Sequence, residues 1–167
     1  MTFETASRPS GSREVFSALG ASLPVVAASV LGGLATYPEI GGWYAGLAKP
    51  SFNPPNSVFG PVWTTLYALM AFGFWRVLRR PGGTSWRGVA IILFFAQIVL
   101  NTLWSFAFFA GHSPGAGLAV IAFLWLAIVA NIVAFAKIDR VSAWTLAPYL
   151  AWVSFAAALN FAIWQLN

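Results

Sequence analysis

The feature of this sequence that most constrains its fold is a set of long apolar stretches that contain no Asp, Glu, Lys or Arg. These stretches run from Val15 to Pro38, Pro50 to Trp75, Gly88 to Ala136 and Val141 to Asn167. A bilayer core needs about 20 apolar residues per helical span. The third stretch is interrupted by Gly111-His112-Ser113-Pro114-Gly115, so it holds two spans. Five spans leave little chain outside lipid, and the sequence predicts a small polytopic membrane protein.

The composition decides which kind of span is present. The chain is 59% hydrophobic and only 8% charged, whereas a soluble domain has about 25% charged residues. Unpaired backbone groups cannot face hydrocarbon, so spans are helices or strands of a closed barrel. Barrel strands alternate in polarity, and these segments do not. We therefore predict an all-α membrane protein, a bundle of five transmembrane helices. The absence of cysteine excludes disulfides and thiolate chemistry.

The organisation that we predict is a polar, disordered tail over residues 1–15 and one five-helix transmembrane domain over residues 16–167. The expected spans cover about residues 16–37, 56–77, 88–110, 115–136 and 143–165. Only the connection between the first two spans is long. It contains Trp43-Tyr44 and the segment Lys49-Pro50-Ser51-Phe52-Asn53-Pro54-Pro55. Proline stiffens the backbone and excludes regular helix, so this connection is predicted to be a stiff Pro/Trp-rich lid over the bundle.

The basic residues indicate the topology. The net charge is +5, but the positions of the charges argue against a nucleic-acid surface. Eight basic residues fall on one side of a five-span chain, and only Lys49 falls on the other. The eight are Arg8, Arg13, Arg76, Arg79, Arg80, Arg87, Lys137 and Arg140. Because cytoplasmic loops collect Lys and Arg, we expect a cytoplasmic N-terminus, with the lid and the C-terminus across the membrane.

Aromatic and amide side chains recur at helical spacing and predict a ligand site beneath the lid. On the second span, one helix face carries Phe59, Trp63 and Tyr67. On the third span, one face carries Gln97, Asn101, Ser105 and Phe108, with Trp104 beside them. On the fifth span, one face carries Tyr149, Trp152, Ala156 and Leu159, bordered by Asn160. Polar side chains at membrane depth face the bundle interior and often have a functional role. Two other interpretations stay open: the tryptophans pack the bundle, and the amides form hydrogen bonds between helices. A concave apolar site with few polar groups suits a large, flat hydrophobic ligand.

Other chemistry in the sequence is sparse. His112 is the sole histidine, and it is either an axial contact to an iron porphyrin or a turn residue without a role. Asp139 is interpreted as a local ion-pair partner or a cap of the fifth span. The sequence contains no Ser-His-Asp set, phosphate loop, metal-ligand cluster or acidic relay. We therefore expect no metal site, no obligatory cofactor and no proton-coupled pump.

Several motifs in order resemble one family. They are Trp43-Tyr44; Lys49-Pro50-Ser51-Phe52 with Pro54-Pro55; Val58-Phe59-Gly60-Pro61-Val62-Trp63-Thr64; Leu100-Asn101 with Trp104-Ser105; and Pro148-Tyr149-Leu150 with Trp152, Phe155 and Leu159-Asn160. This set resembles the translocator protein family (TspO/MBR), also called tryptophan-rich sensory proteins or peripheral-type benzodiazepine receptors. The resemblance covers about residues 34–167.

The resemblance implies a five-helix bundle, commonly a homodimer, with a pocket closed by the first loop. It implies binding of tetrapyrroles such as protoporphyrin IX and haem, and of isoquinoline or benzodiazepine-type lipophiles. The ligand-binding positions that it implies are Tyr44, Pro54, Phe59, Trp63, Tyr67, Asn101, Trp104, Ser105, Phe108, Trp152, Ala156 and Leu159. Trp152 and Trp43 match tryptophans implicated in porphyrin photochemistry. Phe161 and Gln165 replace the Tyr and the basic residue of the family's sterol motif, so cholesterol binding is not expected and a bacterial inner membrane fits better.

Three functions stay open at this point. The first is a tetrapyrrole-binding membrane sensor or regulator, with light- and oxygen-dependent porphyrin degradation that needs no conventional catalytic residue. The second is a passive carrier of porphyrins or other lipophiles. The third is a membrane scaffold. Illumination of the purified protein with porphyrin separates the first two functions, because a carrier leaves the pigment chemically unchanged. A scaffold is expected to show no saturable binding.

Overall fold

The structure, a computed structural model, describes residues 11–80 and 85–167, and every element in this part is helical. The elements in chain order are α1 (Gly11–Ile40), α2 (Trp43–Gly46), α3 (Asn56–Arg79), α4 (Trp86–Ser105), the π-helix η1 (Phe106–Ala110), α5 (Pro114–Ala136), α6 (Arg140–Thr145) and α7 (Ala147–Leu166). The predicted tail up to residue 10, with Arg8, and the Pro81-Gly82-Gly83 turn lie outside the described residues.

Five segments are long and apolar enough to cross a membrane, which confirms the predicted all-α bundle. They are Glu14–Ile40, Asn56–Arg79, Trp86–Ala110, Pro114–Ala136 and Arg140–Leu166. The limits agree with prediction within a few residues, because charged residues or the Gly111–Pro114 turn interrupt the apolar sequence near most span ends. The largest difference is at the start, where α1 begins at Gly11, five residues before the expected first span.

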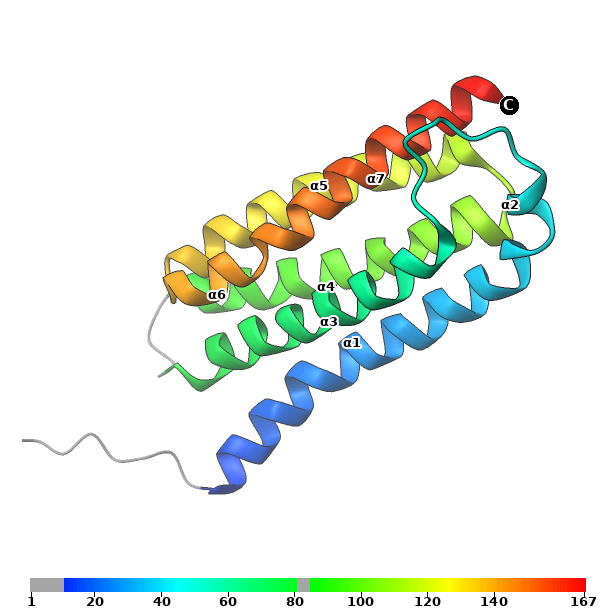
Figure 1. The fold of residues 1–167 in the computed structure, drawn as a ribbon. Coiled ribbons are helices and arrows are strands. Elements are labelled where there is room, and N and C mark those ends of the chain that lie inside the picture. Colours follow the sequence, from blue (N-terminus) through cyan, green and yellow to red (C-terminus); the bar gives the residue numbers. More distant parts are fainter. Residues whose placement is uncertain (1–10, 81–84) are drawn as a thin grey trace, which may run out of the picture.

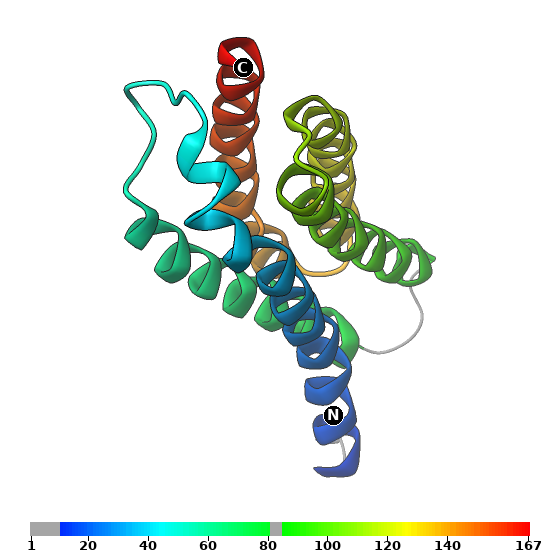
Figure 2. The same ribbon diagram turned by 90° about the vertical axis from the view of Figure 1, so that its right-hand side faces the viewer.

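The helices form a bundle in which sequence neighbours are not always spatial neighbours (Figure 1). Helix α1 packs against both α3 and α4, and α5 packs against both α4 and α7. The last part of α3 also packs against the short helix α6. The beginning of α1 extends past the rest of the bundle, as Figure 2 shows. The connection between α1 and α3 lies at the opposite end, close to the C-terminal end of α7.

The third span changes its helical form before it ends. Residues Phe106–Ala110 form a π-helix, in which Gly111 N donates to Phe106 O at 2.7 Å. A π-turn holds more residues than an α-turn, so the face on which each later side chain lies is rotated. The sequence predicted one continuous α-helix here, and the rotation matters for the site described below.

The fifth span consists of two helices that meet at Leu146. Asp139 caps the first of them, because its side chain accepts a hydrogen bond from Ser142 N. Pro148 lies in the first turn of α7, where proline is tolerated because its missing N–H would have no partner there. The predicted capping role of Asp139 is thereby confirmed.

Asp139 also links two helices at the basic end of the bundle. Its carboxylate pairs with Arg76 at 2.6 Å and with Arg80 at 2.8 Å, and it accepts a bond from the Ser142 hydroxyl at 2.7 Å. The partners are Arg76 of α3 and Arg80 at its end, so the expectation of a local pair with a sequence neighbour is wrong. Mainly through its bond to Arg76, this environment holds the pKa of Asp139 below its usual value, against the opposing effect of burial.

The core in the basic half is built from stacked rings. Phe74 and Phe94 lie 3.8 Å apart between ring centroids, nearly parallel, and Phe135 stacks within 6.4 Å of both. All three are almost completely buried. Stacked aromatic pairs contribute about 0.5–1.5 kcal/mol beyond their buried area, so this cluster fixes α3, α4 and α5 against one another.

Candidate functional site

The connection between α1 and α3 is folded onto itself as a compact lid. Helix α2 supplies one turn, and Tyr44 on it is buried, with its hydroxyl donating to Asn53 Oδ1 at 3.0 Å. The Lys49 ammonium lies 4.7 Å above the Tyr44 ring and donates to the carbonyls of Ala45 and Leu47. Burial raises the pKa of Tyr44, although the bond to Asn53 opposes this shift. The phenol therefore stays neutral and ties the two sides of the lid together.

Hydrogen bonds and ring contacts fasten the lid to the bundle. The Asn167 side chain bonds both the N–H and the carbonyl of Ala48, at 3.0 and 3.1 Å. The Trp43 ring stacks on His112 with centroids 4.8 Å apart. His112 Nε2 lies 2.7 Å from a carboxylate oxygen of Glu39. His112 is a turn residue, as one interpretation expected, but it is not without a role, because it joins the end of α1 to the lid.

A cavity of about 350 Å³ lies beneath this lid. It is bounded by α1, α3, α4, η1, α7 and Tyr44 of the lid. The lining residues are Ser29, Gly32, Gly33, Thr36, Tyr37, Ile40, Tyr44, Asn56, Ser57, Phe59, Gly60, Trp63, Thr64, Tyr67, Trp104, Ser105, Phe109, Trp152 and Ala156. None of these residues is charged, and small-molecule sites typically enclose roughly 300–1,000 Å³. The size and lining therefore suit a hydrophobic small molecule.

The structure brings eight of the twelve predicted ligand residues to this cavity. They are Tyr44, Phe59, Trp63, Tyr67, Trp104, Ser105, Trp152 and Ala156. Pro54 lies half-buried in the lid. Phe108 and Leu159 do not line the cavity and are buried in the adjoining apolar cluster with Tyr44, Phe109 and Ile163. The π-helix explains the exchange of Phe108 for Phe109 in the lining, because it rotates the face on which a continuous α-helix would have placed Phe108.

Asn101, the twelfth predicted residue, lies behind the cavity wall and not on it. Its Oδ1 accepts from the Tyr67 hydroxyl at 2.8 Å, and its Nδ2 donates to the Tyr149 hydroxyl at 3.2 Å. Asn101 thus links α3, α4 and α7 and orients Tyr67 in the cavity wall. Asn160 links helices in the same way, accepting from Trp104 Nε1 at 3.1 Å and donating to Pro114 O at 2.7 Å. For both amides the structure supports interhelical hydrogen bonding, one of the two interpretations that the sequence left open.

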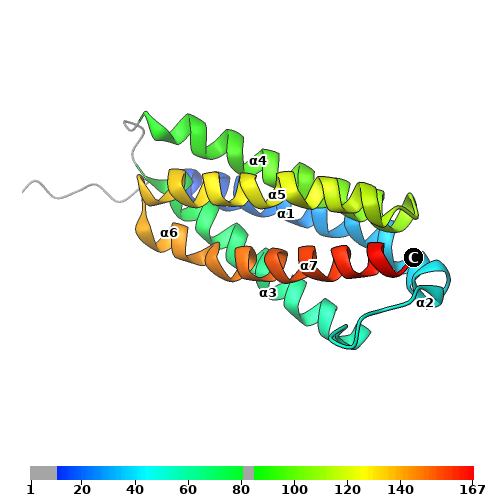
Figure 3. The same ribbon diagram turned by 90° about the horizontal axis from the view of Figure 1, so that it is seen from above.

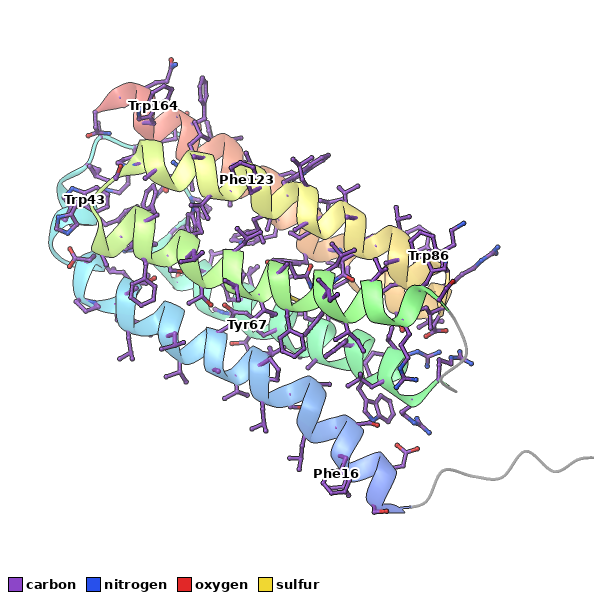
Figure 4. The ribbon with its side chains drawn as sticks, turned by 180° about the vertical axis from the view of Figure 1, so that it is seen from behind. Phe16, Trp43, Tyr67, Trp86, Phe123 and Trp164 are labelled. Carbon is purple, nitrogen blue, oxygen red and sulfur yellow. The ribbon has the colours of Figure 1, made fainter. Side chains whose placement is uncertain are left out.

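The two residues proposed for photochemistry occupy different places. Trp152 forms part of the cavity wall, in edge contact with Phe59 at 5.8 Å and 5.4 Å from the Phe155 ring. Trp43 belongs to the lid and does not line the cavity. Its ring contacts Phe108 at 5.6 Å, and Figure 4 places it at the lid end, far from Trp86. Of the two indoles, only that of Trp152 can touch a molecule in the cavity.

Sequence reasoning missed the contribution of α1, which lines one whole side of the cavity. Ser29, Gly32, Gly33 and Thr36 are small residues at helical spacing, a pattern that by itself predicts only close helix packing. A Cβ at Gly32 would lie 3.3 Å from Ser105 Oγ, so the glycine does bring α1 close to α4. The same small side chains also leave the space that becomes the cavity.

The fold and this site define a class: a multi-pass membrane protein with a lidded, aromatic and uncharged cavity. Residues 20–165 match the model of the TspO/MBR family. Tryptophan-rich protein TspO of Chlorobaculum tepidum is 45% identical over 135 residues, which cover 78% of this chain and 83% of that protein. The translocator protein of Homo sapiens is 39% identical over 126 residues, or 75% of each chain. The tryptophan-rich sensory protein of Cereibacter sphaeroides is 38% identical over 125 residues, 75% of this chain and 77% of that protein.

The chain belongs to the TspO/MBR family. The match covers nearly all of the part that the structure describes, and the relatives span bacteria, archaea and mammals. Family membership agrees with the five apolar helices, and the chain is an integral, multi-pass membrane protein.

Proposed function

We propose that this chain is a membrane sensory or regulatory protein that binds a tetrapyrrole, such as protoporphyrin IX or haem, in the cavity beneath its lid. The observation that carries the proposal is the wall made by Trp63, Tyr67, Trp104 and Trp152, which offers flat aromatic surfaces in an uncharged space. The name of one relative, tryptophan-rich sensory protein, is consistent with this role. The same cavity is proposed to accept isoquinoline and benzodiazepine-type lipophiles.

The residues of the cavity fit the chemistry of a porphyrin ring. A macrocycle is apolar over both faces, and ring contacts with tryptophan and tyrosine add about 0.5–1.5 kcal/mol each beyond buried area. Neutral polar groups, such as the Tyr67 and Ser105 hydroxyls, are present to fix orientation. Tyr67 is held in place by Asn101 at 2.8 Å, so this part of the wall is formed before a ligand arrives.

We further propose that the protein promotes light- and oxygen-dependent breakdown of bound porphyrin. A bound porphyrin would supply light absorption and transfer of energy to dioxygen. What this chain supplies is an oxidisable indole, Trp152, fixed in the cavity wall by Phe59 and Phe155. Such chemistry requires no acid or base, in accord with a lining that contains no carboxylate or histidine. Trp43, outside the lining, is proposed to act only after the lid moves.

Paired substitutions separate binding from photochemistry. Trp152→Phe keeps most of the ring packing but removes the indole, so the Kd for protoporphyrin IX should stay within about tenfold of wild type while light-dependent pigment loss slows strongly. Trp63→Ala should weaken binding by about tenfold or more and slow pigment loss only in proportion to occupancy. Absorbance titration followed by product analysis under illumination measures both.

The matched control is Trp144→Phe, since Trp144 is 75% exposed on α6 and away from the cavity. This variant should behave as wild type in both assays. Saturable binding with unchanged pigment under light would establish the carrier alternative instead. Absence of saturable binding would favour the scaffold. If Trp152→Phe degrades saturating pigment at the wild-type rate, the photochemical role proposed for Trp152 is wrong.

We propose a bacterial inner-membrane location with the basic end of the bundle in the cytoplasm. In the structure, Arg76, Arg79, Arg80 and Arg87 all lie near one end, and Lys49 lies in the lid at the other. Single cysteines introduced at Ser85 and Ser51 should therefore react with an impermeant thiol reagent from opposite sides of intact vesicles. Labelling of both from one side would contradict this topology.

We also propose a homodimer in which the third span takes part. The candidate small residues are Ala107, Gly111 and Gly115. Gly115 already packs against Trp164 of the same chain, because a Cβ there would lie 3.1 Å from Trp164 Nε1. Gly111 is exposed and Ala107 is half-buried. An Ala107→Leu variant should lower the dimer fraction measured in lipid nanodiscs, and an unchanged fraction would remove the case for this face.

A further inference from the structure

A second hollow lies at the basic end of the bundle, opposite the lid. It is a shallow, open hollow of about 380 Å³ and is lined by Ser12, Phe16, Ser17, Leu78 and Arg87. These residues come from the first turns of α1, the last turn of α3 and the first turn of α4. Figure 4 shows Phe16 and Trp86 at this end of the molecule. The hollow belongs neither to the lid nor to the cavity beneath it.

The hollow exists because α1 extends beyond the end of α3. The two helices are in contact at Gly20, where a Cβ would lie 3.6 Å from the Leu78 side chain. The first turns of α1 extend past the end of the bundle (Figure 2) and wall the hollow together with Leu78 and Arg87. An ion pair of 2.6 Å between Arg79 and Glu14 holds this projecting part of α1 in place.

One cation in the hollow has no acidic partner among the residues that the structure describes. Arg79 pairs with Glu14, and Arg80 with Asp139. Arg87 instead donates to the backbone carbonyls of Arg80 and Leu78, the latter at 2.6 Å. These bonds fix the guanidinium while leaving its charge uncompensated by any acid in residues 11–80 and 85–167. The hollow therefore presents a fixed positive charge.

Phe16 and Leu78 form the apolar part of the wall, which lies where membrane spans end. Phe16 is 74% exposed, and Leu78 is in the last turn of the second span. Arg87 is in the first turn of the third span. In a bilayer, such positions lie at the boundary between acyl chains and headgroups, where basic pockets between helices bind anionic lipid headgroups.

We propose that this hollow binds one anionic phospholipid. Its phosphate is held by the Arg87 guanidinium and the Ser17 hydroxyl, and the start of an acyl chain lies along Phe16 and Leu78. Free phosphate would use the charge but none of the apolar wall, so a lipid satisfies both parts. The inference depends on the chain spanning a membrane and not on the ligand of the lidded cavity.

Competition between lipids tests the proposal. Purified protein is incubated with equal amounts of phosphatidylglycerol and phosphatidylcholine, and the bound lipid is counted by native mass spectrometry. Wild type should prefer phosphatidylglycerol. Because one basic residue near a bilayer surface is worth about 1 kcal/mol, Arg87→Gln should lower this preference about fivefold, and Arg87→Lys should retain most of it.

Two further variants separate a site from general charge. Lys137→Gln removes one positive charge near the same end but outside the hollow, and it should leave the preference unchanged. Ser17→Trp fills the hollow while keeping every charge and the Arg87 bonds, and it should abolish the preference even if Arg87→Gln proves unstable. Equal losses in Lys137→Gln and Arg87→Gln, or a wild-type preference in Ser17→Trp, would overturn the proposal. Saturation by inorganic phosphate at the same affinity as the lipid would overturn the assignment to a phospholipid.

Discussion

The two halves of the bundle use similar side chains for opposite purposes. In the basic half, Phe74, Phe94 and Phe135 stack on one another and are almost completely buried. In the lid half, Trp63 and Trp152 also have ring neighbours, but both border a cavity. Aromatic content alone therefore does not decide whether a region is core or site. What decides it is how closely the helices that carry the aromatic rings approach one another.

Helix α3 produces this difference. At Gly73 it lies so close to α6 that a Cβ would collide with the Thr145 hydroxyl and would lie 3.2 Å from Ser142 O. Towards the lid the same helix runs obliquely away from α7, as Figure 3 shows. The bundle is therefore tightly packed where α3 touches α6 and open where α3 diverges from α7. Stability is expected to depend on the first half and binding on the second.

The largest effect on this comparison should come from Asp139→Ala. The Asp139 side chain is 5% exposed and holds Arg76, Arg80 and Ser142. Removing Asp139 breaks its charge-assisted bonds to two partly exposed arginines and removes the cap of α6, which together cost about 2–3 kcal/mol. Thermal unfolding in detergent should show this loss, while the Kd of a ligand in the lidded cavity changes little. Equal damage to binding and stability would contradict the division into two halves.

Glu14→Gln is the matched control, because it also removes one carboxylate from the basic end. The Glu14–Arg79 pair is more exposed, and such surface pairs contribute about 0–1 kcal/mol.

The two variants, Asp139→Ala and Glu14→Gln, should also differ in how their stability depends on pH. The native pKa of Asp139 lies below its usual value of about 3.9. Its stabilising contribution is therefore complete above that value and is lost only as the pH falls below it, and Asp139→Ala should abolish this acid-dependent part.

A smaller effect should separate two neighbouring amides on α4. Asn101 bonds Tyr67 and Tyr149, whereas both polar atoms of Gln97, one turn away and fully buried, have no partner in the described structure. Asn101→Leu should destabilise by about 1 kcal/mol, since it leaves two hydroxyls without their partner. Gln97→Leu should be neutral or stabilising, because it removes an unsatisfied group at nearly constant size. Equal destabilisation, measured by unfolding in the same detergent, would show that Gln97 is bonded after all.

The sequence predicted those parts of the molecule that depend on local pattern. Charged residues bound the apolar runs, so the five spans were located within a few residues. Helical spacing placed Trp63, Trp104 and Trp152 on faces that meet at the cavity. Spacing cannot reveal a π-turn, and for that reason Phe108 was expected in the lining where Phe109 is found.

Contacts between distant residues could not be read from the sequence. Asp139 and Arg76 are 63 residues apart, and Glu39 and His112 are 73 apart. Nothing in the local sequence of His112 indicates an acidic partner, because Glu39 approaches it only when the end of α1 meets the turn after η1. The role of α1 in the cavity was missed for a related reason. Small residues predict close approach of helices, but they do not say whether another helix or a cavity fills the space.

The smallest expected effect concerns the fastening of the lid. Glu39→Gln removes the charge that faces His112 at 2.7 Å, a contact whose two side chains are 25% and 48% exposed. Partly exposed pairs of this kind contribute about 0.2–1 kcal/mol, so lid opening should become up to about fivefold more frequent. Hydrogen exchange of the backbone amides in Trp43–Leu47 should accelerate by that factor, whereas Glu14→Gln at the other end should leave it unchanged. If a ligand leaves only when the lid opens, its dissociation rate should rise in parallel. Faster exchange with an unchanged dissociation rate would show that the ligand leaves between helices and not past the lid.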